Sequence, residues 1–233
     1  DDKTARVWET ATGKMIVELA GHTLSLTKAS FSPDGKFIVT ASRDETARVW
    51  DWRNNKKVIE LRGHTDVINS AVFSPDSKFV VTSSGGKDRT ARVWDVTTGD
   101  KVTLRGHIGG VESAVFNPNG KVVVTASLDA TVRLWSASTG QSLAILRGHS
   151  DEVSAALFSP DGKTIATASK DKTARVYACE ACGNINDTLT LAQKRLELLQ
   201  LTPLANGANA FTSHRPWAIR RFENGTKTTG QTQ

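Results

Sequence analysis

A histidine, a threonine and an aspartate recur together four times along this chain, and these three residue types can form a hydrolytic site. In such a site a hydroxyl attacks the substrate, a histidine removes its proton, and an aspartate orients the histidine. An aromatic residue closes every set. The four candidate sets are His22, Thr40, Asp44 and Trp50; His64, Thr82, Asp88 and Trp94; His107, Thr125, Asp129 and Trp135; and His149, Thr167, Asp171 and Tyr177.

Two features of these sets argue for a structural role and against catalysis. An enzyme needs its active site once, whereas this set recurs in every repeat. A buried indole N–H also needs a hydrogen-bond acceptor, and a chain of histidine, hydroxyl, aspartate and tryptophan satisfies all of these groups at once. We therefore expect no catalytic residues, with Tyr177 as the least regular member of the sets.

An internal repeat positions these sets. The dipeptide Gly-His begins at residues 21, 63, 106 and 148, at spacings of 42, 43 and 42 residues. Each repeat contains a tight turn, in which proline presets φ and the next residues accept left-handed geometry: SPDG, SPDS, NPNG and SPDG. Strand-like runs accompany each turn, such as KASF, FIVTAS, TARVW and KKVIEL. Four short antiparallel strands per repeat predict one propeller blade.

Gly-His, SPDG and the run D-x-T-A-R-V-W-D together resemble the WD-repeat β-propeller family, of a bacterial type with near-identical repeats. The resemblance covers residues 1–178, although the Trp-Asp pair itself stands only at residues 50–51 and 94–95. It implies an all-β propeller of four-stranded antiparallel blades, with about four to four and a half WD repeats, in which the His–Thr–Asp–Trp sets are structural pins. The predicted segments are a partial blade at 1–19 and units at 20–62, 63–105, 106–147 and 148–178.

These repeats are too few for a ring of seven blades, which needs roughly 300 residues. An unclosed array leaves the faces of its first and last blades in water, at a cost on the order of 10 kcal/mol. We therefore expect the chain to be a fragment of a longer propeller, or to self-associate through its open blade edges.

The resemblance also implies the surface through which the chain binds. WD-repeat propellers resemble interaction platforms, whose docking surface is the face with the Gly-His loops and the turn aspartates. Side chains at these positions differ between repeats while the strands hardly change, as a docking face requires. The expected partner-binding residues are Ser25, Thr27, Arg43, Val67, Asn69, Lys87, Gly110, Glu112, Leu128, Glu152, Ser154 and Lys170.

The composition restricts the class of partner. The net charge of +6 is spread along the chain and not gathered in a stripe, so no nucleic-acid partner is expected. No run approaches the ~18 consecutive apolar residues of a membrane-spanning helix, so no membrane partner is expected. The partner is expected to be a protein or peptide. The two cysteines favour a cytoplasmic location without a disulfide framework.

Residues 179–203 and 204–233 differ from the repeats. The first segment combines the C-x-x-C of Cys179 and Cys182 with an amphipathic helix expected over 188–200, and the second lacks periodicity and is expected to be disordered. The cysteines have no second pair for zinc and no βαβ setting for redox chemistry, so a structural or incidental motif is favoured over both.

The sequence thus predicts a non-catalytic protein–protein interaction scaffold, without metal or cofactor, that binds a protein or peptide through its loop face. The alternative comes from the C-terminal segment, which resembles extensions of bacterial WD-repeat proteins fused to STAND-type NTPase or kinase domains. In that alternative the chain is the sensor or regulatory part of a larger signalling protein.

Overall fold

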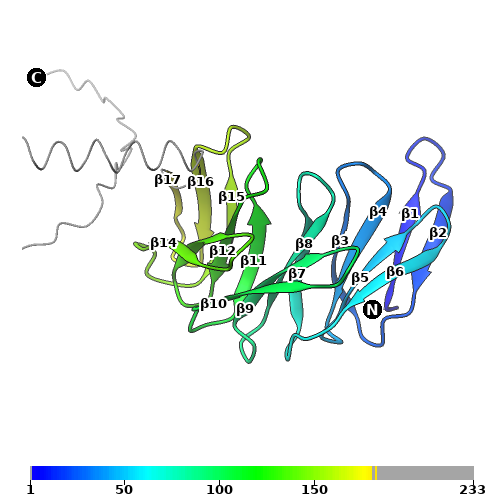
Figure 1. The fold of residues 1–233 in the computed structure, drawn as a ribbon, viewed down its shortest axis with the longest axis horizontal. Coiled ribbons are helices and arrows are strands. Elements are labelled where there is room, and N and C mark those ends of the chain that lie inside the picture. The colour runs from blue at the N-terminus through cyan, green and yellow to red at the C-terminus, as the bar shows by residue number, and fades with distance from the viewer. Residues whose placement is uncertain (1, 180–181, 183–233) are drawn as a thin grey trace, which may run out of the picture. The chain divides into compact units, whose positions relative to one another are not determined.

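Strands form nearly all of the regular structure in the computed structural model, which describes residues 2–179 and 182. Within these residues, seventeen strands form five antiparallel sheets that follow one another in chain order (Figure 1). The expected all-β class with four-stranded antiparallel sheets is therefore confirmed. The first sheet is a two-stranded N-terminal hairpin of β1 (Thr4–Trp8) and β2 (Met15–Ala20).

Three complete blades follow, each built from four consecutive strands. The first blade contains β3 (Leu26–Phe31), β4 (Phe37–Ser42), β5 (Ala47–Asp51) and β6 (Lys56–Leu61). The second contains β7 (Ile68–Phe73), β8 (Phe79–Ser84), β9 (Thr90–Asp95) and β10 (Lys101–Arg105). The third contains β11 (Val111–Phe116), β12 (Val122–Ser127), β13 (Val132–Ser136) and β14 (Ser142–Leu146). The terminal sheet has three described strands, β15 (Val153–Phe158), β16 (Thr164–Ser169) and β17 (Ala174–Ala178).

The turn between the first two strands of a blade is built by one short motif. In the first blade, the Ser32 hydroxyl donates to Asp34 Oδ1 at 2.6 Å and accepts from the Phe37 N–H at 2.9 Å. Gly35 then takes a φ of 68°, in the left-handed region that favours glycine. Ser77 takes this position in the second blade, with a φ of 62°, and its Oγ accepts from the Asp34 N–H at 3.2 Å. The turns of the first and second blades are therefore linked to each other.

The hydrophobic core lies between neighbouring blades. Val39 and Val49 of the first blade pack with Ile68 and Phe73 of the second, and all four side chains are at most 4% exposed. Equivalent clusters join the second blade to the third and the third to the terminal sheet. Because the blades bury both faces, their middle strands read as nearly continuous apolar runs.

The terminal sheet and the inner strand of the first blade each leave positions that the described residues do not cover. Val49 and Leu134, at the centre of third strands, are 1% exposed, whereas Val176 at the same place in β17 is 68% exposed. Ala29 of β3 is likewise exposed, although its counterpart Ala71 in β7 is fully buried. Figure 1 shows the hairpin and the terminal sheet at opposite ends of the row of blades. Compared with a complete blade, the hairpin lacks the first two strands among the described residues. The terminal sheet lacks the fourth strand among them.

Most of the segments 179–203 and 204–233 lies outside the described residues, and so do the helix expected over 188–200 and the disorder expected beyond it. Cys179 and Cys182 are described, and a disulfide joins them, with their Cα atoms 5.3 Å apart. The sequence argument excluded only a framework of several disulfides and did not consider this single bond, although cysteines so close in the chain can reach the Cα separation that the bond needs. Cys182 also packs into the core between the third blade and the terminal sheet, so the pair has a structural role. Within the described part of the chain, no helix has the length and apolarity to cross a membrane.

Candidate functional site

The His–Thr–Asp–aromatic sets lie beneath the Gly-His loops. In the first blade, His22 Nδ1 lies 2.8 Å from Asp44 Oδ2, and His22 Nε2 lies 2.8 Å from Thr40 Oγ1. Trp50 Nε1 donates to the same Thr40 oxygen at 2.9 Å. His22 precedes β3, Thr40 lies in β4, Asp44 follows β4, and Trp50 lies in β5. One hydrogen-bonded relay therefore joins a loop, a turn and two strands.

The chemistry of these groups gives each hydrogen bond a direction. A carboxylate only accepts, so His22 donates from Nδ1–H to Asp44. Burial lowers the pKa of His22, against the opposing effect of the Asp44 carboxylate, and the ring is neutral. Its Nε2 is then an acceptor for the Thr40 hydroxyl, whose oxygen accepts from Trp50. Although burial alone would raise it, hydrogen bonds from Thr46, the loop backbone and His22 hold the pKa of Asp44 well below its usual range.

The other repeats keep this geometry with two departures. In each of them a histidine Nε2 lies 2.7–2.8 Å from the threonine oxygen, and in the second and third blades the tryptophan donates to that oxygen at 2.8 Å. His64 Nδ1 lies 3.1 Å from Asp88 Oδ1, without the alignment of a hydrogen bond. Tyr177 donates instead to the Arg147 carbonyl at 3.4 Å. Among the described residues, the relay of the terminal sheet therefore lacks the aromatic donor that the complete blades have.

The position of the threonines does not suit a catalytic nucleophile. Thr40, Thr82 and Thr125 have no exposed surface, and Thr167 is 3% exposed. A nucleophile must contact its substrate, and these hydroxyls are enclosed within the sheets. Among residues 2–179 and 182, no three His, Cys, Asp or Glu side chains gather as the ligands of a metal ion would.

One further residue of each repeat contributes to this arrangement and was missed among the sequence-predicted sets. It is the arginine two positions before the aromatic residue. A β-carbon on Gly21 would lie 2.5 Å from Arg48 Nη1, and one on Gly106 would lie 2.6 Å from Arg133 Nη1. The guanidinium thus lies against the glycine of Gly-His, where a larger residue would collide with it. The recurrence of arginine in TARVW and TVRLW, together with the constant glycine, is the sequence pattern that could have indicated this contact.

The expected partner-binding residues surround the relays with different exposures. The exposed ones are Thr27, Arg43, Lys87, Leu128, Ser154 and Lys170. The half-buried ones are Ser25, Val67, Asn69, Glu112 and Glu152. Gly110 was expected to be exposed, but it is buried against the Gly85–Gly86 turn, where a β-carbon would lie 3.0 Å from the Gly86 nitrogen.

Several of these residues also hold the blades together. The Thr27 hydroxyl donates to the Ile68 carbonyl at 2.5 Å, and the Asn69 amide donates to the Val111 carbonyl at 3.0 Å. In contrast, the side chains of Arg43 and Lys87 form no hydrogen bond or ion pair with any described residue. These two cations are therefore available to a partner.

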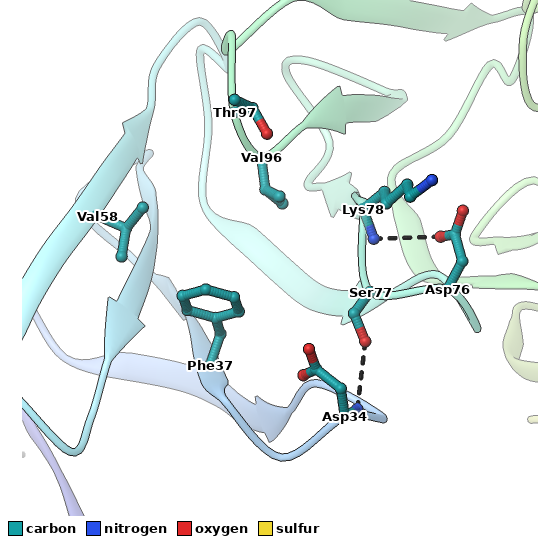
Figure 2. Close-up of a pocket in the computed structure, with 8 residues that line it drawn as sticks. All are labelled: Asp34, Phe37, Val58, Asp76, Ser77, Lys78, Val96 and Thr97. Atoms are coloured by element: carbon teal, nitrogen blue, oxygen red, sulfur yellow. Dashed lines mark hydrogen bonds between the residues drawn. The ribbon is translucent and has the colours of Figure 1, made fainter.

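A groove of about 370 Å³ lies between the first and second blades, on the side of the SPDG and SPDS turns. Figure 2 shows the side chains that line it. Phe37, Val58 and Val96 supply its apolar side chains, and Asp34 and Asp76 supply its carboxylates. Each carboxylate already accepts hydrogen bonds within its own turn. We therefore assign the two acids to turn formation.

A second groove, of about 220 Å³, lies beside the turn that follows Gly85 and Gly86 in the second blade. It is lined by Lys87, Asp88, Arg89, Thr90, Arg105 and His107. The Arg89 guanidinium donates to the carbonyls of Gly86 and Ile108. The other two cations of the lining, Lys87 and Arg105, have no ion pair or side-chain hydrogen bond with a described residue. This groove adds positive charge to the loop side of the second blade.

Replacing Thr40 by valine removes the oxygen at the centre of the first relay. His22 Nε2 and the Trp50 indole would be left buried without that partner, and each such group costs about 1–3 kcal/mol. We expect Thr40→Val to lower the free energy of unfolding by about 2–4 kcal/mol in urea titrations. Thr167→Val is the matched control, because no tryptophan donates to Thr167, and it should cost less than about half as much. Equal losses in the two variants would contradict the relay.

Comparisons with known proteins agree with this geometry. The family model described as WD domain, G-beta repeat, matches residues 13–51, 55–95, 100–136 and 140–178. Each matched segment begins at or just before the outer strand of one sheet and ends with the third strand of the next, so every segment joins two sheets.

Two curated relatives share a shorter stretch. Elongator complex protein 2 of Mus musculus is 50% identical over 38 residues, which are 16% of this chain and 5% of that protein. Elongator complex protein 2 of Rattus norvegicus is 47% identical over 38 residues, with the same coverage of 16% and 5%. The aligned part is thus a small fraction of the relatives, about the length of one repeat. With four matched repeats and their blades in the structure, the chain belongs to the WD-repeat family.

Proposed function

We propose that this chain is a non-catalytic scaffold that binds a protein or peptide through the face bearing its Gly-His loops. The observation that carries the proposal is a contrast within each repeat. The His–Thr distance stays at 2.7–2.8 Å in all four repeats. The residue just before the turn aspartate, however, changes from Arg43 to Lys87, Leu128 and Lys170. A fixed frame beneath side chains of different charge and size supports specific recognition.

The loop face has a charge pattern that a partner can match in one orientation. Arg43, Lys87 and Lys170 are exposed cations in three of the repeats, and Leu128 is an exposed apolar side chain at the same position in the remaining one. Lys170 Nζ pairs with Glu152 Oε2 at 2.5 Å, whereas the other two cations have no described partner. Burial, together with the neighbouring negative charge of Glu152, raises the pKa of Glu112. These groups give each repeat a distinct contribution to binding.

A protein or peptide remains the proposed partner, with no nucleic acid or membrane. The spread of the positive charge over the chain supports the exclusion of nucleic acid. We also propose a cytoplasmic location. The Cys179–Cys182 disulfide is evidence against it, because thiols are kept reduced in that compartment. Cell fractionation with thiol trapping tests the location. The alternative of a sensor in a larger signalling protein depends on residues outside those described, and no contact among the described residues favours it.

Charge reversal on the loop face tests the proposed function. Peptides selected from a displayed random library on the wild-type chain serve as the probe. The triple variant Arg43→Glu, Lys87→Glu, Lys170→Glu is expected to weaken their binding by roughly tenfold or more, because each reversed side chain is exposed on the face that contacts the peptide. The melting temperature should stay unchanged, since none of these side chains belongs to a relay.

The turn lysines provide the matched control. Lys36, Lys78 and Lys163 are also exposed, and each follows a tight turn on the opposite side of the blades. Their triple reversal changes the net charge equally and should leave binding within about twofold of wild type. Equal losses in both triple variants would show that binding depends on overall charge, and the loop-face proposal would fail.

We further propose that copies of the chain self-associate through their uncovered blade faces. Leu157 and Val176 are 56% and 68% exposed on one face of the terminal sheet, and Phe31 of β3 is 54% exposed at the other end. In the complete blades the counterparts of these positions pack together, as Val49 does with Phe73. A contact between two such different faces is heterologous and joins copies head to tail.

Sedimentation velocity tests this association. The wild-type chain is expected to form larger species as its concentration rises through the micromolar range. Val176→Asp should restore the monomer, because it places a charge on the uncovered face, while Val58→Asp at another exposed valine should not. A wild-type chain that stays monomeric throughout would contradict the proposal.

A further inference from the structure

In the first blade, three cations share one carboxylate. Arg48 Nε lies 3.2 Å and Lys57 Nζ 2.9 Å from Glu60 Oε2, and Arg62 pairs with the other oxygen of the same side chain. Glu60 lies on the outer strand β6, directly opposite Arg48 on β5. Although burial opposes ionisation, the hydrogen bond from Lys57 and the charges of the three cations lower the pKa of Glu60. This carboxylate balances the positive charge at the outer edge of the first blade.

The second blade keeps all three cations and lacks the carboxylate. Arg92 lies opposite position 103 and Lys101 lies opposite Trp94, in the register that Arg48 and Lys57 have in the first blade. Arg105 precedes Gly106 as Arg62 precedes Gly63. The residue at position 103, where the first blade has Glu60, is a threonine. We call Arg92, Lys101 and Arg105 the second-blade cation cluster.

The members of this cluster lie close to one another. A β-carbon on Gly63 would lie 2.5 Å from Arg92 Nη1 and 2.7 Å from Lys101 Nζ. Burial is the main cause that lowers the pKa of Arg92, and the positive charge of Arg105 lowers it further. Arg92 and Lys101 therefore lie together, and Arg105 follows Lys101 on the same face of β10, on the far side of Thr103.

Their described partners do not balance these charges. Arg92 Nη2 lies 3.4 Å from Asp88 Oδ2, the one ion pair that Arg92 forms with a described residue, and the Arg92 side chain is 9% exposed. Lys101 Nζ lies 5.3 Å from the centroid of the Trp94 ring. Arg105 is exposed, lines the loop-side groove and has no described ion pair. Asp88 is itself occupied by bonds from Thr90 and the Thr65 backbone.

The other described sheets differ from the second blade, although Arg133 Nε of the third blade is also buried without a hydrogen-bond partner. In the N-terminal hairpin, Arg6 Nε lies 2.7 Å from Glu18 Oε2, so the cation has its acid. In the third blade, Ile145 lies opposite Arg133, and Ser142 replaces the lysine opposite the tryptophan. Among the described sheets, only the second blade therefore keeps all three cations while lacking the acid.

We propose that the second-blade cation cluster binds the carboxylate side chain of an acidic peptide segment at the outer edge of β10, beside Thr103. The first blade supplies the reason for this ligand class, because the same three residue positions hold a carboxylate there. Bonds between charged nitrogen donors and a carboxylate are strong when the donors converge on it. This site goes beyond the proposed loop-face function, since none of its three cations is among the loop-face positions.

Thr103→Glu tests the site by supplying the missing acid from within the chain. The first blade shows that this arrangement folds. The probe is fluorescein-labelled hexaglutamate, with hexaglutamine as the uncharged peptide, and fluorescence anisotropy on the full chain measures the Kd. We expect hexaglutamate alone to bind the wild type, and Thr103→Glu to weaken it by roughly tenfold or more. Glu60→Thr should strengthen it by creating a second cluster of the same kind in the first blade.

Two controls separate the cluster from size and overall charge. Thr103→Gln has the size of the glutamate variant without its charge and should bind within about twofold of wild type. Asn119→Asp adds one negative charge in a tight turn where the other repeats already have aspartate, and it should also bind within about twofold.

Three results would overturn the proposal. One is equal weakening in Thr103→Glu and Asn119→Asp, which would reduce the effect to overall charge. Another is hexaglutamate binding no tighter than hexaglutamine. The third is a lower Kd for inorganic phosphate than for hexaglutamate at matched ionic strength, which would assign the cluster to phosphate and not to a carboxylate side chain.

Discussion

The rest of the structure depends on the hydrogen bonds of one threonine hydroxyl, which lies in the second strand of each complete blade. The Thr40 oxygen accepts a hydrogen bond from an indole N–H on the third strand, and the Thr40 hydroxyl donates one to a histidine in the preceding loop. The histidine must be neutral for this, and burial lowers the pKa of His22 accordingly. The Asp44 carboxylate in turn holds the histidine proton on Nδ1. A single buried oxygen thus sets the positions of two strands, a turn and a loop.

This internal frame separates the parts of a repeat that must stay constant from those that can change. Because the strand ends are held from within, the residue just before each turn aspartate can vary, and it differs in charge from Arg43 to Leu128. The outer strands show the same freedom. The second blade has Thr103 where the first has Glu60, and it still keeps the histidine–threonine contact of the relay, with His64 Nε2 at 2.7 Å from Thr82 Oγ1. A blade can therefore lose an internal acid, keep its fold and present its cations to a partner.

The sequence was enough to predict the all-β blades and, apart from Tyr177, the residues of the relays, because these appear in a constant order within every repeat. The contact of Arg48 with Gly21 and the loss of the acid at Thr103 could not be predicted in that way, since they depend on which residues lie opposite each other on neighbouring strands. The burial of Gly110 depends on Gly85 and Gly86 of the preceding blade, which pack against it. The disulfide of Cys179 was missed because only the folded turn shows its two sulfur atoms side by side.

Hydrogen exchange of the indole N–H protons, followed by NMR, tests the central claim most directly. Trp50, Trp94 and Trp135 each donate to a fully buried threonine, whereas Trp8 is 54% exposed. If the relays hold the blades together, the three buried indole protons should exchange only when the blades unfold, orders of magnitude more slowly than that of Trp8. Exchange of these three protons at the rate of Trp8 would contradict the account.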